Sequence, residues 1–228
     1  MTRAYLKNDA EIELTLRRVP QARRVSLRVS RLDGRVTLTM PTRLPVEEAL
    51  EFAESRIDWI RRARADAPVS VTVAPGAVIP IEGRAVTIAA ATGRGVRCIE
   101  DVLEVRGTGA AGAVRAYLKT LARTRLAAAS DRYADTLGVT YGRLTLRDTR
   151  SRWGSCSSAG HLMYSWRLIM APPDVLDYVA AHEVAHLRHM DHSQAFWDTV
   201  ASIYPDWKAK RDWLRSDGAG LHRYRFGD

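Results

Sequence analysis

The segment HEVAHLRHMDH, residues 182–192, contains four of the six histidines in the chain together with one glutamate. His182 and His186 are four residues apart, so on a helix they lie on one face, one turn apart. Two imidazoles in this arrangement can bind one zinc ion at about 2.0–2.1 Å. Glu183 follows the first of them, where it can accept a proton from a water on the metal. The spacing therefore predicts a hydrolytic metal centre with Glu183 as general base.

The distribution of glutamates supports this interpretation. Glu183 is the only glutamate from Val105 to the C-terminus, although aspartates are frequent in the same region. A single glutamate at the position of the base favours catalysis over polar decoration of a surface helix. It also excludes one common arrangement, in which a glutamate from a downstream helix is the third zinc ligand.

A catalytic zinc ion needs a third protein ligand and one open coordination position. His189 lies on the same helical face as the first two histidines, and three ligands in a line along one helix do not form a tetrahedron. His192 follows the expected helix end at Met190-Asp191, where the chain can turn back toward the metal. We therefore favour His192, with His222 as second choice. Asp191 can orient a ligand or cap the next helix. The downstream aspartates are the remaining candidates: Asp198, Asp206 and Asp212.

The elements that must position this site are a helix and short strands. Pro172-Pro173 begin a run that predicts a helix through the histidine cluster to about His189. Upstream, residues 113–138 predict a long helix that stops at Gly138. A strand over about Leu144 to Leu146 follows, and residues 152–168 predict two short strands around a Ser/Gly turn.

The N-terminal half is rich in predicted strands. Residues 12–40 alternate apolar and polar side chains, with a hairpin signal at Asp33-Gly34, and predict an antiparallel meander. Pro45 begins one helix, and residues 69–106 predict four or five more strands. The sequence thus predicts an α+β protein with a β-rich region at 1–108, of antiparallel strands plus one helix, and a catalytic domain at 109–228. No internal repeat is evident.

The composition is that of an ordinary globular protein, apart from its charge. Among 228 residues, 46% are hydrophobic and 27% charged, and the formal net charge is +9. The excess is nearly all arginine, which fits either an anionic partner or a genome that favours arginine codons.

Cys98 and Cys156 form no disulfide framework, and neither a signal sequence nor a membrane-spanning run is evident. We expect a cytoplasmic protein without a membrane partner, and the oligomeric state stays open.

The segment TRSRWGSCSSAG, residues 149–160, offers groups that could bind substrate. Arginine forks, hydroxyls and turn amides, as at Arg150, Arg152 and Ser155, are suited to a polyphosphate. The alternative is that the serines satisfy a turn and the arginines are solvated. Tyr164 is a candidate donor to a developing oxyanion, as are Tyr178 and Tyr224.

The run from Arg152 (RWGSCSSAGHL, then SWRL, then LDYVAAHEVAHLRHMDHSQAFW) resembles the YgjP-like family of bacterial zincin-type metalloproteins, relatives of SprT-like and WLM proteins. The resemblance extends to VPQARRVSLRVSRLDGRVTLTMP and so covers most of the chain. It implies a minimal zincin-type, metalloprotease-like domain with His182, His186 and His192 as zinc ligands and Glu183 as base. The spacing HExxHxxxxxH also matches metzincins, but their pattern has glycine where this chain has His189.

The resemblance implies a zinc-dependent hydrolase, with another divalent metal as an option, and leaves the substrate open. Family members are mostly described as metallopeptidases, and in zincins the strand before the active helix pairs with a peptide. That strand is expected here near His161 to Ser165. Some members are linked instead to hydrolysis of nucleoside triphosphates, notably UTP, to the monophosphate and pyrophosphate. A third hypothesis is a DNA-associated or partner-binding module with structural zinc, since SprT-like relatives act on DNA-bound proteins and a basic hairpin could follow phosphates. Its arginines are Arg23, Arg24, Arg28, Arg31 and Arg35.

Overall fold

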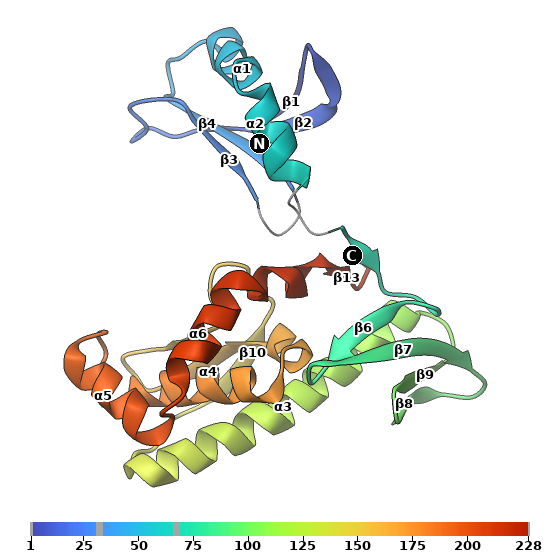
Figure 1. Ribbon diagram of the computed structural model, residues 1–228, viewed down its shortest axis with the longest axis vertical. Helices are drawn as coiled ribbons and strands as arrows, with labels where there is room; N and C mark the ends of the chain where they lie inside the picture. The colour runs from blue at the N-terminus through green and yellow to red at the C-terminus, as the bar shows by residue number, and fades with distance from the viewer. Residues whose placement is uncertain (1, 31–33, 66–68, 228) are drawn as a thin grey trace. The chain divides into compact units, whose positions relative to one another are not determined.

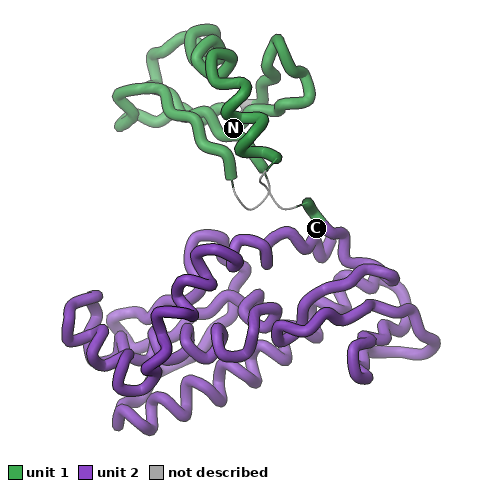
Figure 2. Tube along the Cα trace, viewed as in Figure 1, with its two compact units in different colours: residues 1–70 green, residues 71–228 purple. Residues whose placement is uncertain are grey.

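The computed structural model describes residues 2–30, 34–65 and 69–227, and the chain divides into two compact units (Figure 2). Unit 1 is residues 1–70 and unit 2 is residues 71–228. The expected boundary at residue 108 is therefore wrong. Strand residues such as Leu103 share one hydrophobic core with the helices that follow, so the second set of strands belongs to unit 2.

Unit 1 contains a four-stranded sheet with strand order β1-β2-β4-β3 (Figure 1). The expected hairpin is confirmed, because β3 and β4 pair antiparallel; Asp33 of its turn lies outside the described residues. The expected meander is wrong, because β2 and β4 are parallel. The first strand, β1, was not expected and pairs with one edge of β2. As a result β4 pairs with the other edge of β2, and β3 pairs with the outer edge of β4. The strands are β1 (Thr2–Leu6), β2 (Asp9–Arg18), β3 (Ser26–Val29) and β4 (Val36–Met40).

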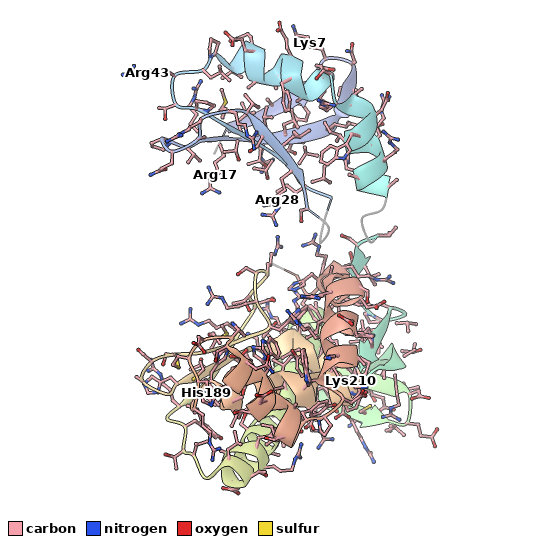
Figure 3. All side chains as sticks on the ribbon, turned by 60° about the vertical axis from the view of Figure 1, so that its left-hand side comes forward. Lys7, Arg17, Arg28, Arg43, His189 and Lys210 are labelled. Atoms are coloured by element: carbon pink, nitrogen blue, oxygen red, sulfur yellow. The ribbon has the colours of Figure 1, made fainter. Side chains whose placement is uncertain are left out.

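Two helices, α1 (Val46–Glu54) and α2 (Ile57–Ala65), pack on one face of this sheet, where a single helix was expected. The break falls at Ser55, whose hydroxyl donates a hydrogen bond to the Phe52 carbonyl at 2.7 Å. The opposite face is polar: Arg17 and Arg28 both extend from it (Figure 3). Alternation along each strand thus separates a core face from a solvent face.

The second four-stranded sheet, in unit 2, repeats the topology of the first. Its order is β6-β7-β9-β8, again two antiparallel hairpins joined by a parallel central pair. The sequence shows no such repeat, because the topology requires only matching alternation and turns, not matching residues. The strands are β6 (Val78–Ile81), β7 (Arg84–Ala91), β8 (Gly95–Ile99) and β9 (Val102–Arg106).

The remainder of unit 2 builds the site. The long helix α3 (Ala110–Leu137) packs against both α4 (Pro173–Ala185), which carries the start of the HExxH motif, and the 3-10 helix η1 (Trp166–Met170) (Figure 1). None of the helices in the described ranges is both long and apolar enough to cross a membrane. The other elements are β5 (Val71–Thr72), β10 (Leu144–Arg147), β11 (Gly154–Cys156), β12 (Leu162–Ser165), α5 (Gln194–Ile203), α6 (Trp207–Ser216), η2 (Gly218–Arg223) and β13 (Tyr224–Arg225).

Two local features near the site differ from expectation. The small sheet has the order β10-β12-β11, so the strand expected along the cleft, near His161 to Ser165, is central. Its antiparallel neighbour β11 is the edge strand instead. In addition, α4 ends at Ala185 and not near His189. The sheet edge available for pairing is thus that of β11, which is closer to the HExxH motif than the sequence predicts. The turn after α4 is also closer to the motif than expected.

Candidate metal centre

The last turn of α4 presents the two residues that begin the motif. Pro173 at the start of the helix has no backbone N–H to leave unsatisfied, which suits a first-turn position. His186 is the C-cap residue, and the chain then tightens into a turn in which the Leu187 N–H bonds to the Val184 carbonyl at 3.0 Å. The early end of the helix allows the following loop to fold back over its last turn. His192 reaches the two helical histidines in this way.

Three histidines converge at this point: His182, His186 and His192. One nitrogen from each lies within 4.8 Å of the others. The Nε2 atoms of His182 and His192 are 3.2 Å apart. Ligand nitrogens of a tetrahedral zinc site, with bonds of 2.0–2.1 Å, are separated by about 3.3 Å. The arrangement therefore fits a metal ion of this size, with the fourth side left for water or substrate.

The protonation states of these imidazoles suit metal binding. Burial and the neighbouring His186 and His192 lower the pKa of His182 to about 3, and burial lowers that of His186 as well. Both rings are thus neutral near pH 7, as ligands must be. The Nδ1 atom of His186 lies 2.9 Å from the His189 carbonyl oxygen, so it donates there and leaves Nε2 for the metal. His182 Nδ1 is buried and, within the described ranges, has no hydrogen-bond partner.

Helix α5 supplies an aromatic support behind the three histidines. The Phe196 ring stacks on His186 at 4.4 Å between centroids, and the Trp197 ring stacks on the exposed His192 at 5.7 Å. Trp197 is itself stacked on Trp207 at 4.4 Å, and the Arg211 guanidinium lies 4.8 Å from its ring centroid. This stack holds the histidine that comes from a loop, whereas α4 and its C-cap hold the other two.

The loop before α5 is fixed by capping. The Ser193 side chain accepts a hydrogen bond from the Phe196 N–H, and the Asp191 carboxylate accepts one from the Ser193 N–H at 3.2 Å. The N-cap of α5 is thus Ser193 and not Asp191, whose carboxylate instead fixes the turn that precedes the cap. These contacts set the start of α5 and, with it, the positions of the aromatic rings.

Glu183 is buried between α4 and the edge strand β11, with 5% of its surface exposed. Burial raises its pKa to about 8, while the charge of Arg152 and the backbone N–H of Cys156 lower it. A Cβ atom on Gly154 would lie 2.5 Å from Glu183 Oε1, so only glycine leaves room for the carboxylate here. A group with a pKa near the working pH is suited to accept and return a proton.

A cavity of about 430 Å³ opens in front of this cluster. Arg152 and Ser155 line it, as the sequence predicts for substrate-binding residues. Arg150 is exposed and is not among the lining residues. Tyr164 is fully buried, and its hydroxyl lies 3.0 Å from Ser130 Oγ, so it is a core residue and cannot contact substrate. The lining residues are Ser151, Arg152, Gly154, Ser155, Cys156, His182, Glu183, His186, Met190 and His192.

Comparison with known proteins identifies the family of this chain. The family model described as "YgjP-like, metallopeptidase domain" matches residues 23–217. The chain belongs to the YgjP-like family. A metallopeptidase domain implies a bound metal ion, typically zinc.

One solved structure with detectable similarity is the metallopeptidase zymogen abylysin of Pyrococcus abyssi. It shares 22% identity and a TM-score of 0.36 over 41% of this chain and 92% of its own. No curated protein sequence matches the chain significantly.

The other candidate ligands of this YgjP-like protein lie elsewhere. His222 is buried, with its ring 5.3 Å from that of Trp153, and is not part of the histidine group. Asp198 accepts a hydrogen bond from the Gln194 side chain at 2.7 Å. The remaining aspartates pair with basic side chains: Asp206 with Lys210 and Asp212 with Arg215.

Sequence reasoning on the YgjP-like motif missed the residues that support the site. Phe196 and Trp197 follow His192 by four and five residues, and this aromatic pair was the available signal. Gly154 gave no signal by itself, because the need for glycine arises from Glu183, which is 29 positions away in sequence. The role of Gly154 depends on a contact between β11 and α4, and a local sequence pattern cannot predict such a contact.

Proposed function

We propose that this protein is a zinc-dependent peptidase in which His182, His186 and His192 hold the metal and Glu183 is the general base. The observation that carries the proposal is the position of the Glu183 carboxylate, buried beside the three histidines and against the edge strand β11. A zinc ion at the histidines would supply a Lewis acid that polarises the scissile carbonyl and lowers the pKa of water to about 7.

Glu183 then transfers the proton. Its carboxylate accepts a proton from the attacking water and returns it to the nitrogen of the leaving amine. Because the carboxylate is buried, it is shielded from bulk water while it holds that proton. The Cys156 backbone N–H and Arg152 favour its charged form before the reaction. They only partly offset the effect of burial, which raises the pKa of Glu183 to about 8, so the charged form that acts as base increases as the pH rises through 8.

The edge strand β11 is suited to bind the substrate backbone. Along β11 the main chain of Trp153 and Ser157 bonds toward the β12 side, as in the Ser165 N–H bond to the Trp153 carbonyl at 2.8 Å. In an antiparallel pair the main-chain groups of the alternate residues then face the other way, so those of Gly154 and Cys156 face the outer edge, where the Cys156 N–H bonds to Glu183 and Gly154 offers its groups to a substrate. An extended peptide that pairs with this edge would bring its carbonyl carbon past Glu183.

A panel of substrates tests the proposal. Purified protein loaded with zinc, manganese or magnesium is incubated in parallel with an unfolded protein and with nucleoside triphosphates. We expect zinc-dependent cleavage of the unfolded protein, seen as new N-termini by mass spectrometry. Release of pyrophosphate from a nucleotide, with no peptide cleavage, would contradict the proposal. A variant with both His182 and His186 replaced by alanine serves as the contamination control.

A further inference from the structure

A second cavity, of about 220 Å³, lies beside the metal-site cavity, and we call it the side pocket. Gly154, His182 and Glu183 line both cavities, so the two adjoin at these residues. The side pocket therefore borders the place where the scissile bond would lie. Its other lining residues are Trp153, Tyr178, Val179 and Leu214.

The four residues that line only the side pocket are uncharged and come from two helices and the residue before β11. Trp153 precedes β11, Tyr178 and Val179 are on α4 about one turn before His182, and Leu214 is on α6. Their faces toward the cavity are largely hydrocarbon, with the Tyr178 phenol as an added polar group. Burial raises the pKa of this phenol to about 12, so it stays neutral. The wall thus favours an apolar occupant.

The wall has a defined shape. A Cβ atom on Gly218 would lie 3.0 Å from Cζ2 of Trp153, so the indole is packed against the start of η2. The His222 ring, also on η2, lies 5.3 Å from the Trp153 ring. A ring held by these contacts is a preformed surface, which costs little conformational entropy when a ligand binds.

The size and charge of the side pocket limit its occupant. An engineered apolar cavity of about 150 Å³ in another protein binds benzene, so 220 Å³ is sufficient for the side chain of leucine, methionine or phenylalanine. The charges that act on Tyr178 have both signs, Arg211 and Arg215 against Glu183 and Asp212, so they do not offset the cost of burying a charged side chain at this wall.

We infer that the side pocket binds a medium-sized apolar side chain next to the scissile bond of a peptide substrate. This inference rests on the proposed peptidase function and specifies which side chain the enzyme prefers beside the cleaved bond. A peptide paired with the β11 edge at Gly154 passes the junction of the two cavities, where one flanking side chain enters the side pocket. Burial of such a side chain raises kcat/KM by about 10- to 100-fold over alanine at that position.

Cleavage of a peptide library by the full-length zinc protein is the first test. We expect enrichment of leucine, methionine or phenylalanine at one position beside the cleaved bond. Leu214→Trp fills the side pocket and should shift the preference to glycine and alanine, whereas Leu214→Ala should admit tryptophan. Leu121→Trp, at a half-buried leucine of α3 outside both cavities, is the matched control and should keep the wild-type profile. An unchanged profile in both Leu214 variants would overturn the inference.

A binding measurement separates this inference from the peptidase proposal. Methyl NMR spectra of the zinc-loaded protein are recorded during titration with N-acetyl-leucinamide and, in parallel, N-acetyl-glycinamide. We expect saturable shifts of the Leu214 and Val179 methyls with the leucine probe only. Absence of such shifts overturns the side pocket whether or not peptides are cleaved. Saturable binding without cleavage of any peptide supports the side pocket and rejects the peptidase function.

Discussion

Gly154 and Glu183 are in contact across β11 and α4: a Cβ atom on residue 154 would lie 2.5 Å from Oε1 and 2.6 Å from Cγ of the glutamate. Because the carboxylate has no room to move into the strand, the glycine fixes how closely the base approaches the strand edge. The WGSC segment thus has a physical role in the site although it contributes no metal ligand.

Gly154→Ala should therefore reduce catalysis without removing the metal. The added methyl displaces the Glu183 carboxylate, and a displacement near 1 Å can cost about 100-fold in rate. We expect a loss of this order in kcat/KM with zinc content unchanged, measured by peptide cleavage and by metal analysis. Gly112→Ala, on α3 with open space around the site of its Cβ, is the control and should match the wild type or be slightly more stable. Full activity in Gly154→Ala would show that the contact has no catalytic role.

The choice of third ligand can be tested by metal affinity. His192→Ala removes a ring whose Nε2 lies 3.2 Å from that of His182, so zinc affinity should fall by at least 100-fold in a chelator competition. His189→Ala should keep nearly full affinity, because the contact of His189 with the site is through its backbone carbonyl. Equal affinities for the two variants would show that His192 is not a ligand.

Trp197 should stabilise metal binding through His192. Trp197→Leu removes the indole that stacks on this exposed ring, so we expect about tenfold weaker zinc affinity and an altered visible spectrum of the cobalt-substituted protein. Trp197→Phe should recover part of the affinity, since it restores an aromatic face. Trp59→Leu, a change at an exposed indole of unit 1, is the control. An unchanged spectrum in Trp197→Leu would mean that the stack does not position the ligand.

His222 should make the stability of unit 2 depend on pH. Burial, and then Arg167, lower its pKa to about 4 from an ordinary 6.5; Asp148 opposes this shift, and Arg150 and Arg225 add to it. A neutral buried histidine contributes its full stability above pH 6.5 and loses it as the pH falls through 4. The loss is about 2–3 kcal/mol in the free energy of unfolding.

Denaturant unfolding of the metal-free protein at several pH values between 7 and 4 measures this loss. His222→Gln should show a shallower fall in stability over that range, because glutamine does not titrate. Parallel curves for the variant and the wild type would contradict the assignment.

The chemistry of the site was more predictable than its surroundings. HExxH spacing requires only the helical period, so His182, His186 and Glu183 could be grouped from sequence alone. His192 required one further assumption, that the helix ends early enough for the loop to return. The helix ends at Ala185, earlier than expected, which brings that loop closer to the motif.

The β architecture was only partly predictable, because alternation identifies strands but not their partners. The hairpin of β3 and β4 followed from local turn chemistry. The parallel pairing of β2 with β4, and the edge position of β11, depend on which neighbours compete for each edge. Tyr164 illustrates the same limit: its place next to Ser130 in the core could not be read from the strand that carries it.

Glu183→Gln tests the central claim most directly. Glutamine has nearly the same size but cannot accept the proton, so the variant should fold and bind one zinc ion with wild-type affinity while peptide cleavage falls by at least 1000-fold. Cleavage of an unfolded protein and zinc stoichiometry are measured on the same preparations of wild type and variant. Retained cleavage at matched zinc content would contradict the role of Glu183 and the mechanism built on it.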